Sequence, residues 1–170
     1  AAGIVVSKLG TAVVSRFALN QFLTTDSTLV LREELPVFKE ENKSRKVVFT
    51  NGCFDVLHQG HRKLLKQAKK LGDVLVVGLN SDESITRLKG ADRPVNGWKQ
   101  RLDVISALPF VDAVIVFEED TPLELLQELK PNVLVKGGDY NPDEVVGKDE
   151  VDEVVIIPLV EGISTTKLIS

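Results

Sequence analysis

The sequence contains no methionine, one cysteine, one tryptophan and only two histidines among its 170 residues. Because a single cysteine cannot form an internal disulfide, a disulfide-stabilised secreted scaffold is excluded. No run of apolar residues approaches the ~18 that a membrane-spanning helix requires. Residues 1–6 also lack the basic stretch of a secretory signal, so we expect a cytoplasmic protein with no membrane partner.

An excess of positive charge is missing as well. The chain has 21 Lys and Arg against 25 Asp and Glu, which gives a net charge of −4 and a pI near 5.3. Proteins that bind nucleic-acid backbones usually carry a basic excess, so we expect no nucleic-acid partner and only local phosphate binding. A hydrophobic content of 43% and a charged content of 27% indicate a globular domain rather than a disordered chain.

Short apolar runs rich in β-branched residues recur after residue 46, at residues 47–49, 74–79, 114–117, 133–135 and 154–157. Continuous runs of this length are typical of strands buried on both faces. Helical patterns alternate with them, and we expect helices near residues 61–71, 98–107, 122–130 and 164–170. This alternation predicts an α/β fold with a doubly wound parallel sheet, in which ligands bind beyond the carboxyl ends of the strands.

Residues 24–45 interrupt the apolar pattern with polar and charged residues, and this change in composition predicts a linker. The segment before it, residues 1–23, is too short to bury a core of its own. We therefore expect two parts. An amino-terminal segment of residues 1–43 docks opportunistically or stays mobile, and residues 44–170 form the domain.

The strongest functional signal is the stretch from Thr50 to His61, which follows the first predicted strand and precedes a helix with a basic face. Both histidines, His58 and His61, lie in it, so their imidazoles can converge over one helix N-terminus. The free amides and the positive end of the helix dipole favour an anion there. Gly52 and Gly60 allow backbone N–H groups to approach phosphate oxygens closely. The pattern indicates a polyphosphate site.

Two other interpretations of the histidines stay open. They can be structural residues that are satisfied at a helix cap, or they can bind zinc, although no further histidine is present and Cys53 is the only thiol. Cys53 at a strand end is itself more typical of a structural thiol than of a nucleophile. A Walker loop is excluded, because Gly-x-x-x-x-Gly-Lys-[Ser/Thr] does not occur.

Gly52-Cys-Phe-Asp55 together with His58-x-Gly-His61 resembles the cytidylyltransferase and adenylyltransferase superfamily, in which H-x-G-H binds the triphosphate. Further matches follow in order: Val77-Gly-Leu-Asn-Ser-Asp82, Arg87-Leu-Lys-Gly90, Arg93-Pro-Val-Asn96, Arg101, Asp120-Thr-Pro122, Val133-Leu-Val-Lys-Gly-Gly-Asp-Tyr140 and Glu161-Gly-Ile-Ser-Thr-Thr166. The resemblance is strongest to the adenylyltransferase domain of bifunctional heptose kinase/adenylyltransferases. Residues 1–15 resemble the end of the ribokinase-like kinase domain that precedes it in those enzymes.

The resemblance implies a Rossmann-like nucleotidyltransferase. Its expected reaction transfers AMP from ATP to D-glycero-β-D-manno-heptose 1-phosphate, which gives ADP-heptose and pyrophosphate for lipopolysaccharide core synthesis. ATP and a sugar 1-phosphate are thus the expected partners, and a homodimer is left open. Two alternatives remain: a CTP-dependent enzyme acting on an alcohol phosphate such as glycerol 3-phosphate, and an inactive nucleotide-binding module.

The resemblance also implies roles for individual residues. His58, His61 and Lys89 are the expected catalytic residues, and Arg93 is the expected contact to the substrate phosphate. Nucleotide binding is expected of a larger set: Thr50, Asn51, Gly52, Cys53, Phe54, Gly60, Arg101, Gly137, Asp139, Gly162, Ser164, Thr165 and Thr166. Simpler alternatives stay open for Lys89, as a solvated side chain, and for residues 164–166, as a helix cap alone.

Mg²⁺ is the expected cofactor, held mainly by phosphate oxygens and with few protein ligands. Asp55 is a candidate helper for the ion. We expect its main role to be different, namely to hold the loop in place through hydrogen bonds to backbone amides.

Overall fold

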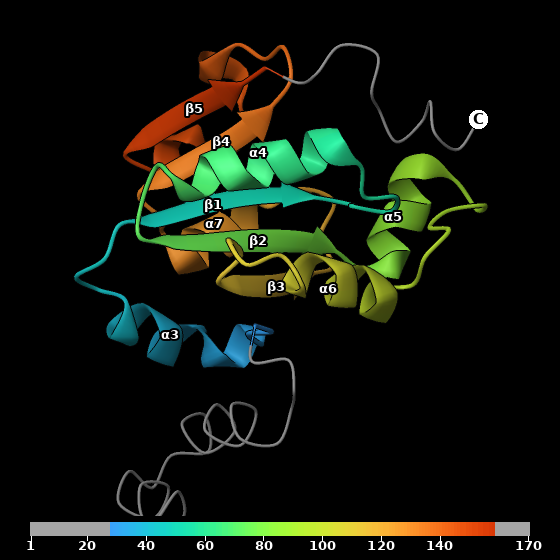
Figure 1. Ribbon diagram of the computed structural model, residues 1–170, viewed down its shortest axis with the longest axis horizontal. Helices are drawn as coiled ribbons and strands as arrows, with labels where there is room; N and C mark the ends of the chain where they lie inside the picture. The colour runs from blue at the N-terminus through green and yellow to red at the C-terminus, as the bar shows by residue number, and fades with distance from the viewer. Residues whose placement is uncertain (1–27, 159–170) are drawn as a thin grey trace, which may run out of the picture.

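The computed structural model describes residues 28–158, and these residues form a five-stranded sheet in which all paired strands run parallel (Figure 1). The strands are β1 (Val47–Gly52), β2 (Val74–Asn80), β3 (Ala113–Phe117), β4 (Val133–Gly137) and β5 (Glu153–Ile157). Their order across the sheet is β3-β2-β1-β4-β5. The chain therefore builds the sheet outward from β1 to β3 and then returns to add β4 and β5 on the other side. This confirms the predicted doubly wound sheet.

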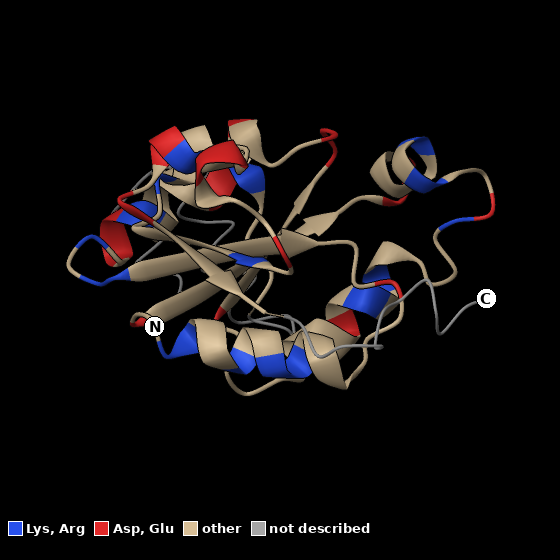
Figure 2. Cartoon of the chain, turned by 90° about the horizontal axis from the view of Figure 1, so that it is seen from above, with Lys and Arg blue, Asp and Glu red and all other residues tan. Residues whose placement is uncertain are grey.

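Helices α4 (Gln59–Lys69) and α6 (Trp98–Ser106) cover one face of the sheet, and α3 (Leu35–Glu41) and α7 (Leu123–Leu129) cover the other (Figure 1, Figure 2). Helix α5 (Asp82–Lys89) lies beyond the carboxyl ends of the strands (Figure 1). Three short 3-10 turns complete the described elements: η1 (Arg32–Glu34), η2 (Pro142–Glu144) and η3 (Lys148–Glu150). The helices predicted near residues 61–71, 98–107 and 122–130 are confirmed as α4, α6 and α7. The helix predicted at residues 164–170 lies outside the described residues. No helix of residues 28–158 is long and apolar enough to span a membrane.

The core consists of two apolar layers, one on each face of the sheet. Successive side chains of a strand point to opposite faces, so Val48 packs in the layer beneath α4 and α6 while Phe49 packs in the layer beneath α3 and α7. Every residue of β2 is buried, because β2 lies between β1 and β3 and is covered on both sides. This double burial explains why the strands are continuous apolar runs in the sequence.

The predicted linker over residues 24–45 is wrong for residues 28–41. Leu29 forms a parallel bridge with Val114 of the edge strand β3. In α3, Leu35 is 2% exposed and Phe38 is 7% exposed, and both belong to one of the two core layers. Charged residues are frequent in this stretch, but Val30, Leu35 and Phe38 are buried in the same core layer. Residues 28–41 are therefore part of the folded domain.

Candidate active site

The loop of residues 53–58 lies at the carboxyl edge of the sheet, between the end of β1 and the start of α4 (Figure 1). β1 pairs with β2 on one side and with β4 on the other, so the direction of winding reverses between β1 and β4. In open α/β sheets a crevice for ligands forms at such a reversal. The motif that the sequence singled out is thus placed where this fold binds ligands.

His58 and His61 cap the first turn of α4 with the same ring nitrogen. Nδ1 of His58 accepts a hydrogen bond from the N–H of Gly60 at 3.0 Å, and Nδ1 of His61 accepts one from the N–H of His58 at 3.3 Å. A neutral imidazole that accepts at Nδ1 carries its proton at Nε2. Neither Nε2 has a hydrogen-bond partner within residues 28–158. Each ring therefore caps the helix on one side and offers a free N–H donor on the other.

The two imidazole rings are stacked, with centroids 3.9 Å apart and planes inclined by 25°. Burial lowers the pKa of both histidines, and the charges of His58 and Lys89 help to lower the pKa of His61 to about 4. Two stacked imidazolium ions would also repel each other. Both rings are therefore neutral near pH 7 and donate as neutral N–H groups.

Phe54 supports His61 from the loop. Its ring is 6% exposed and meets the imidazole of His61 edge to face, with centroids 5.3 Å apart. Phe54 has a φ of 48°, in the left-handed region that is unfavourable for bulky residues. A Cβ at Gly52 would lie 2.9 Å from Cε2 of Phe54, so only glycine lets the ring fold back under the loop.

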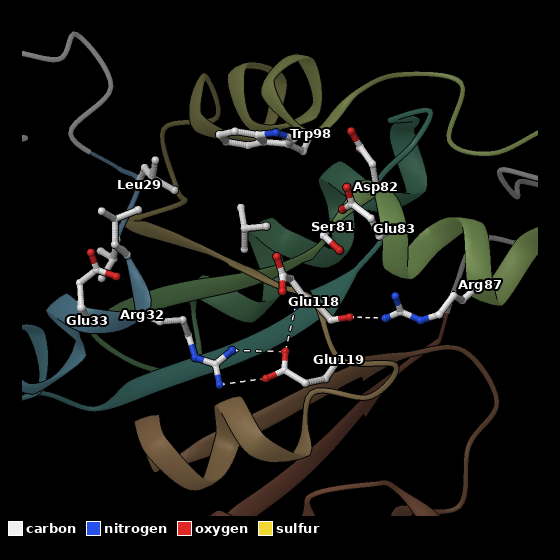
Figure 3. A pocket seen from close by; sticks show the side chains of 13 residues that line it. Leu29, Arg32, Glu33, Ser81, Asp82, Glu83, Arg87, Trp98, Glu118 and Glu119 are labelled. Atoms are coloured by element: carbon white, nitrogen blue, oxygen red, sulfur yellow. Dashed lines mark hydrogen bonds and ion pairs between the residues drawn. The ribbon is translucent and has the colours of Figure 1, made fainter.

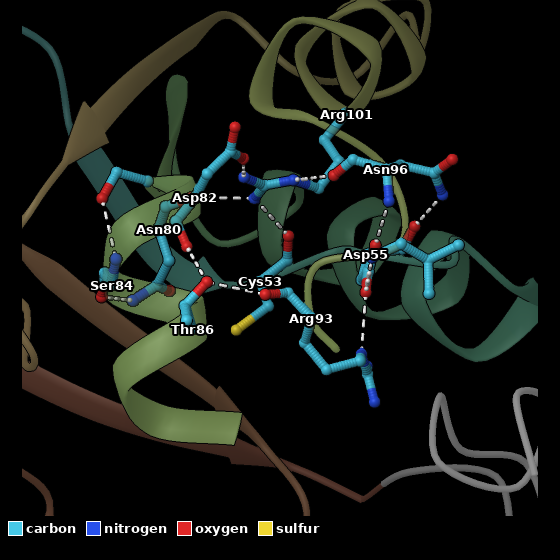
Figure 4. A network of polar contacts seen from close by, with 11 residues as sticks. Cys53, Asp55, Asn80, Asp82, Ser84, Thr86, Arg93, Asn96 and Arg101 are labelled. Atoms are coloured by element: carbon cyan, nitrogen blue, oxygen red, sulfur yellow. Dashed lines mark hydrogen bonds and ion pairs between the residues drawn. The ribbon is translucent and has the colours of Figure 1, made fainter. Parts of the chain in front are cut away.

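Asp55 fixes this loop to the segment before α6 (Figure 4). Its carboxylate accepts hydrogen bonds from the backbone N–H groups of Val95 and Asn96, at 2.9 and 2.8 Å, and from Nε of Arg93 at 3.0 Å. Burial alone would raise the pKa of Asp55, but these donors outweigh it and hold the pKa below its usual value. The predicted loop-holding role of Asp55 through backbone amides is confirmed.

Arg101 joins three loops at the edge of the site (Figure 4). The residue is 1% exposed. Its guanidinium donates to the carbonyl oxygens of Cys53, Asn80 and Asn96 at 2.8, 2.7 and 3.0 Å, and to Oδ1 of Asp82 at 2.7 Å. Most of its donors are thus already satisfied by the protein. This arrangement favours a positioning role, and the predicted contact of Arg101 with nucleotide stays a prediction.

A pocket of about 180 Å³ opens between the carboxyl ends of β1 and β4, and we call it the β1–β4 pocket. Its lining residues are Thr50, Asn51, Gly52, Cys53, Phe54, His61, Leu64, Lys136, Gly137 and Tyr140. Leu64, Lys136 and Tyr140 were not predicted, whereas the other lining residues were. Thr50 donates its hydroxyl to the carbonyl of Val135 at 2.9 Å, which ties β1 to β4. The structure therefore brings six of the nine predicted nucleotide-binding residues that it describes to one place.

The family model described as cytidylyltransferase-like matches residues 49–170, a range that includes the histidine pair and the β1–β4 pocket. The chain belongs to the cytidylyltransferase-like family of nucleotidyltransferases. It is 51% identical over 175 residues to the bifunctional protein HldE of Campylobacter concisus (strain 13826). It is 47% identical over 178 residues to the bifunctional protein HldE of Helicobacter hepaticus. Each match covers 99% of this chain and 37% of the relative, so the chain spans little more than a third of these relatives.

Two solved structures resemble this nucleotidyltransferase. The lipopolysaccharide core biosynthesis protein from Thermoplasma volcanium GSS1 is 30% identical, with a TM-score of 0.60, over 69% of this chain and 99% of that chain. The pantoate-beta-alanine ligase from Francisella tularensis, complexed with beta-gamma ATP and beta-alanine, has a TM-score of 0.57 over 82% of this chain and 75% of that chain. Its identity of 16% supports a shared fold and nothing more.

The other residues predicted for this cytidylyltransferase-like site are spread more widely. Gly60 lies in the first turn of α4, and Lys89 is the exposed last residue of α5. Asp139 is exposed and does not line the β1–β4 pocket. Four of the predicted residues lie outside the described part of the chain and stay predictions: Gly162, Ser164, Thr165 and Thr166.

One nitrogen of the Arg93 guanidinium is an unsatisfied hydrogen-bond donor among the described residues. Its Nε pairs with Asp55, while its Nη2 is buried and has no hydrogen-bond partner within residues 28–158. An unsatisfied buried donor costs about 1–3 kcal/mol, so it is usually retained for a ligand or for water. The predicted contact of Arg93 with a substrate phosphate is consistent with this free donor and stays a prediction.

The donor set of this nucleotidyltransferase site suits phosphate oxygens better than metal ions. Imidazole N–H groups and ammonium groups donate hydrogen bonds and do not bind Mg²⁺, which prefers oxygen ligands. The carboxylate of Asp55 is engaged by three donors. Within residues 28–158 no cluster of three or more His, Cys, Asp or Glu side chains could hold a metal ion. The described residues therefore do not form a protein shell for Mg²⁺.

A second, larger cavity of about 880 Å³ lies between residues 29–33 and the helices α5 and α6, and we call it the edge cavity (Figure 3). Carboxylates surround it, including those of Asp82, Glu118 and Glu119. Both arginines that line it are ion-paired, Arg32 with Glu119 at 3.0 Å and Arg87 with Asp120 at 2.9 Å. None of the predicted site residues lines this cavity. Its charge makes it a poor place for a polyphosphate.

Proposed function

We propose that this domain transfers AMP from ATP to a sugar 1-phosphate, D-glycero-β-D-manno-heptose 1-phosphate, and so forms ADP-heptose and pyrophosphate. The observation that carries the proposal is the capping geometry of His58 and His61, in which neither Nε2–H has a partner within residues 28–158 and His61 lines the β1–β4 pocket. The similarity to bifunctional proteins HldE and to a lipopolysaccharide core biosynthesis protein supports a sugar phosphate as the acceptor.

In this reaction an oxygen of the sugar phosphate attacks the α-phosphorus of ATP. A new P–O bond forms, and the bond from the α-phosphorus to the oxygen that bridges it to the β-phosphate breaks. The bridging oxygen keeps the electron pair and leaves with pyrophosphate. Since the attacking phosphate is already an anion at neutral pH, the protein need not supply a general base. Its task is to align two anions and to stabilise the charge that develops on the leaving group.

The two histidines are suited to that task. Their Nε2–H groups would donate to phosphate oxygens of ATP, and the hydrogen bonds would strengthen as charge builds up on the leaving pyrophosphate. Because burial keeps both rings neutral, they act as hydrogen-bond donors and not as proton donors. Their orientation is fixed beforehand by the Nδ1 caps, so little reorganisation is needed during the reaction.

The flanking cations would complete the charge balance. Lys89 lies close enough to His61 to affect its pKa and can reach the triphosphate, and Arg93 can offer its free Nη2 to the acceptor phosphate. Mg²⁺ enters this proposal with the nucleotide, as the Mg–ATP substrate, since its preferred oxygen ligands are those of the phosphates.

The test is a nucleotide panel with the 170-residue chain. Release of pyrophosphate is measured with ATP or CTP, each paired with heptose 1-phosphate or glycerol 3-phosphate. We expect the fastest release with ATP and heptose 1-phosphate. Faster release with CTP and glycerol 3-phosphate would show that the protein is a cytidylyltransferase. ATP binding without any release of pyrophosphate would show an inactive nucleotide-binding module.

A further inference from the structure

Lys136 lies inside the β1–β4 pocket, near the end of β4 (Val133–Gly137). Its Nζ donates a hydrogen bond to Oδ1 of Asn51, near the end of β1, at 3.0 Å. The side chains of His61 and Tyr140 line the same pocket. The ammonium group is thus held where the winding of the sheet reverses, next to one of the two proposed phosphate donors.

Lys136 is half-buried, and within residues 28–158 its ammonium lacks the counter-charge that two other cations near the site have. Arg101 pairs with Asp82 at 2.7 Å, and Arg93 pairs with Asp55 at 3.0 Å. In the part of the chain that the structure describes, no carboxylate forms an ion pair with Lys136, and Asn51 is its one hydrogen-bond partner. Burial lowers the pKa of Lys136, with no neighbouring carboxylate to oppose the effect.

The fold does not need a cation at this position. The preceding residues of β4, Val133, Leu134 and Val135, are apolar and buried, and an uncharged residue could follow them. Withdrawing an ammonium from water without a counter-ion costs free energy. A charged group that is kept at such a cost, and that faces a pocket, is a candidate for ligand binding.

We propose that Lys136 binds a phosphate oxygen of a substrate from the β4 side of the pocket, while His61 reaches the pocket from α4. This inference rests on the proposed function, in which both substrates carry phosphate and the sugar phosphate carries no other anionic group. The phosphate belongs either to ATP or to the sugar 1-phosphate. In both cases it supplies the counter-charge that residues 28–158 do not.

The test measures binding at equilibrium by calorimetry, with ATP, adenosine and heptose 1-phosphate as ligands. Lys136→Met removes the charge, Lys136→Gln keeps a donor for Asn51 without the charge, and Lys136→Arg restores the charge. Lys66→Met, at an exposed position on α4, is the matched control. We expect Lys136→Met and Lys136→Gln to lower the affinity for a phosphate ligand by roughly tenfold to a hundredfold. The affinity for adenosine should stay unchanged. Lys136→Arg should recover part of the loss.

The pattern of losses identifies the phosphate. Weaker ATP binding with unchanged adenosine binding supports a contact to the nucleotide. Weaker binding of heptose 1-phosphate with unchanged ATP binding supports a contact to the acceptor. Equal losses for ATP and adenosine, or unchanged binding of all three ligands, would overturn the inference.

Stability gives a second readout. Lys136→Met should unfold at the same temperature as the wild type or at a higher one, because an unpaired charge has been removed. A lower unfolding temperature with unchanged phosphate binding would show a structural role and overturn the inference. A wild-type chain that binds ATP in a Lys136-dependent manner but releases no pyrophosphate would refute the proposed function alone.

Discussion

The β1–β4 pocket and the edge cavity lie at the carboxyl ends of neighbouring strands but differ in size and charge. The edge cavity holds about 880 Å³ and is surrounded by carboxylates, whereas the β1–β4 pocket holds about 180 Å³ and receives His61 and Lys136. A polyphosphate would meet repulsion in the larger space and N–H donors in the smaller one. Under the proposed function, donor chemistry and not volume distinguishes the active site from the larger cavity. Four predictions test it, from the largest expected effect to the smallest.

The largest effect is expected when the helix-capping side of each imidazole is kept and its Nε2–H donor is removed. In His58→Asn and His61→Asn the amide oxygen can replace Nδ1 as the helix cap, but nothing replaces the Nε2–H donor. We expect folded protein whose turnover is lower by about 10²–10³, the range for losing one preorganised donor. Pyrophosphate release and thermal unfolding are measured on the same samples.

The reverse substitutions, His58→Gln and His61→Gln, keep a donor near Nε2 and remove the helix cap. Glutamine places an N–H near the position of Nε2 but loses the cap at Nδ1, so it should retain more turnover and less helix stability than asparagine. Wild-type turnover in both asparagine variants would eliminate the phosphate role of the histidines.

The second prediction concerns the rigidity of the pocket rim. Asp55→Asn removes the partner of a buried arginine and weakens two backbone hydrogen bonds. We expect the free energy of unfolding, measured in urea, to fall by about 2–4 kcal/mol. Asp103→Asn, at an exposed site on α6, is the control and should change it by less than about 0.5 kcal/mol. Equal unfolding midpoints for the two variants would contradict the loop-holding role.

The third prediction is a pH effect. The pKa of His61 falls from 6.5 to about 4 in the folded protein, so below pH 6.5 the unfolded chain takes up a proton that the folded protein does not. The free energy of unfolding should therefore decrease as the pH is lowered from 6.5 toward 4. The contribution of His61 is on the order of 1 kcal/mol after allowance for its partial exposure.

The control for the pH effect is His61→Asn, which does not titrate in this range. Wild type and variant are unfolded in urea at several pH values, and only the difference between them is interpreted. Asp55 contributes in the same direction at lower pH, but it is present in both proteins and cancels. Parallel pH profiles would show that folding does not lower the pKa of His61.

The smallest effect is expected in the edge cavity. Glu119→Gln breaks the ion pair with Arg32, which is partly exposed, so the loss of stability should stay below about 1 kcal/mol. Turnover should change by less than about twofold, because no substrate phosphate binds there. A large loss of turnover in this variant would show that the edge cavity takes part in the reaction and would reverse the comparison.

Much of the fold could be predicted because its strands are buried on both faces. Such strands are continuous apolar runs in the sequence, and each predicted run falls within or overlaps an observed strand. The helix α5 was missed because only Ser84 and Ile85 of its residues are buried, which leaves almost no apolar periodicity. The helix α3 was missed for a similar reason, since Leu35 and Phe38 are its only buried residues.

The candidate site likewise contains residues that could be predicted from the sequence and residues that could not. The histidine pair could be predicted because its residues lie close together in the sequence and at a recognisable spacing. Lys136 could not, because a missing counter-charge becomes visible only when neighbours from other strands are in place. Arg101 was expected to touch nucleotide, but its guanidinium is held by carbonyl oxygens from the end of β2 and from two separate loops. Sequence patterns identify sites whose residues lie close together in the sequence. The pairing of charged side chains depends on the fold, which brings distant residues together.

The short pairing of residues 28–30 with β3 also bears on how the chain behaves when it is shortened. Val114 donates to the carbonyl of Thr28 at 2.8 Å and accepts from the N–H of Val30 at 2.9 Å. A chain that starts at residue 44 would leave this sheet edge open and uncover the apolar surface beneath Phe38. Open edges and apolar patches of this kind promote aggregation. Removal of residues 28–41 is therefore expected to promote self-association, and a soluble shorter version should begin before residue 28.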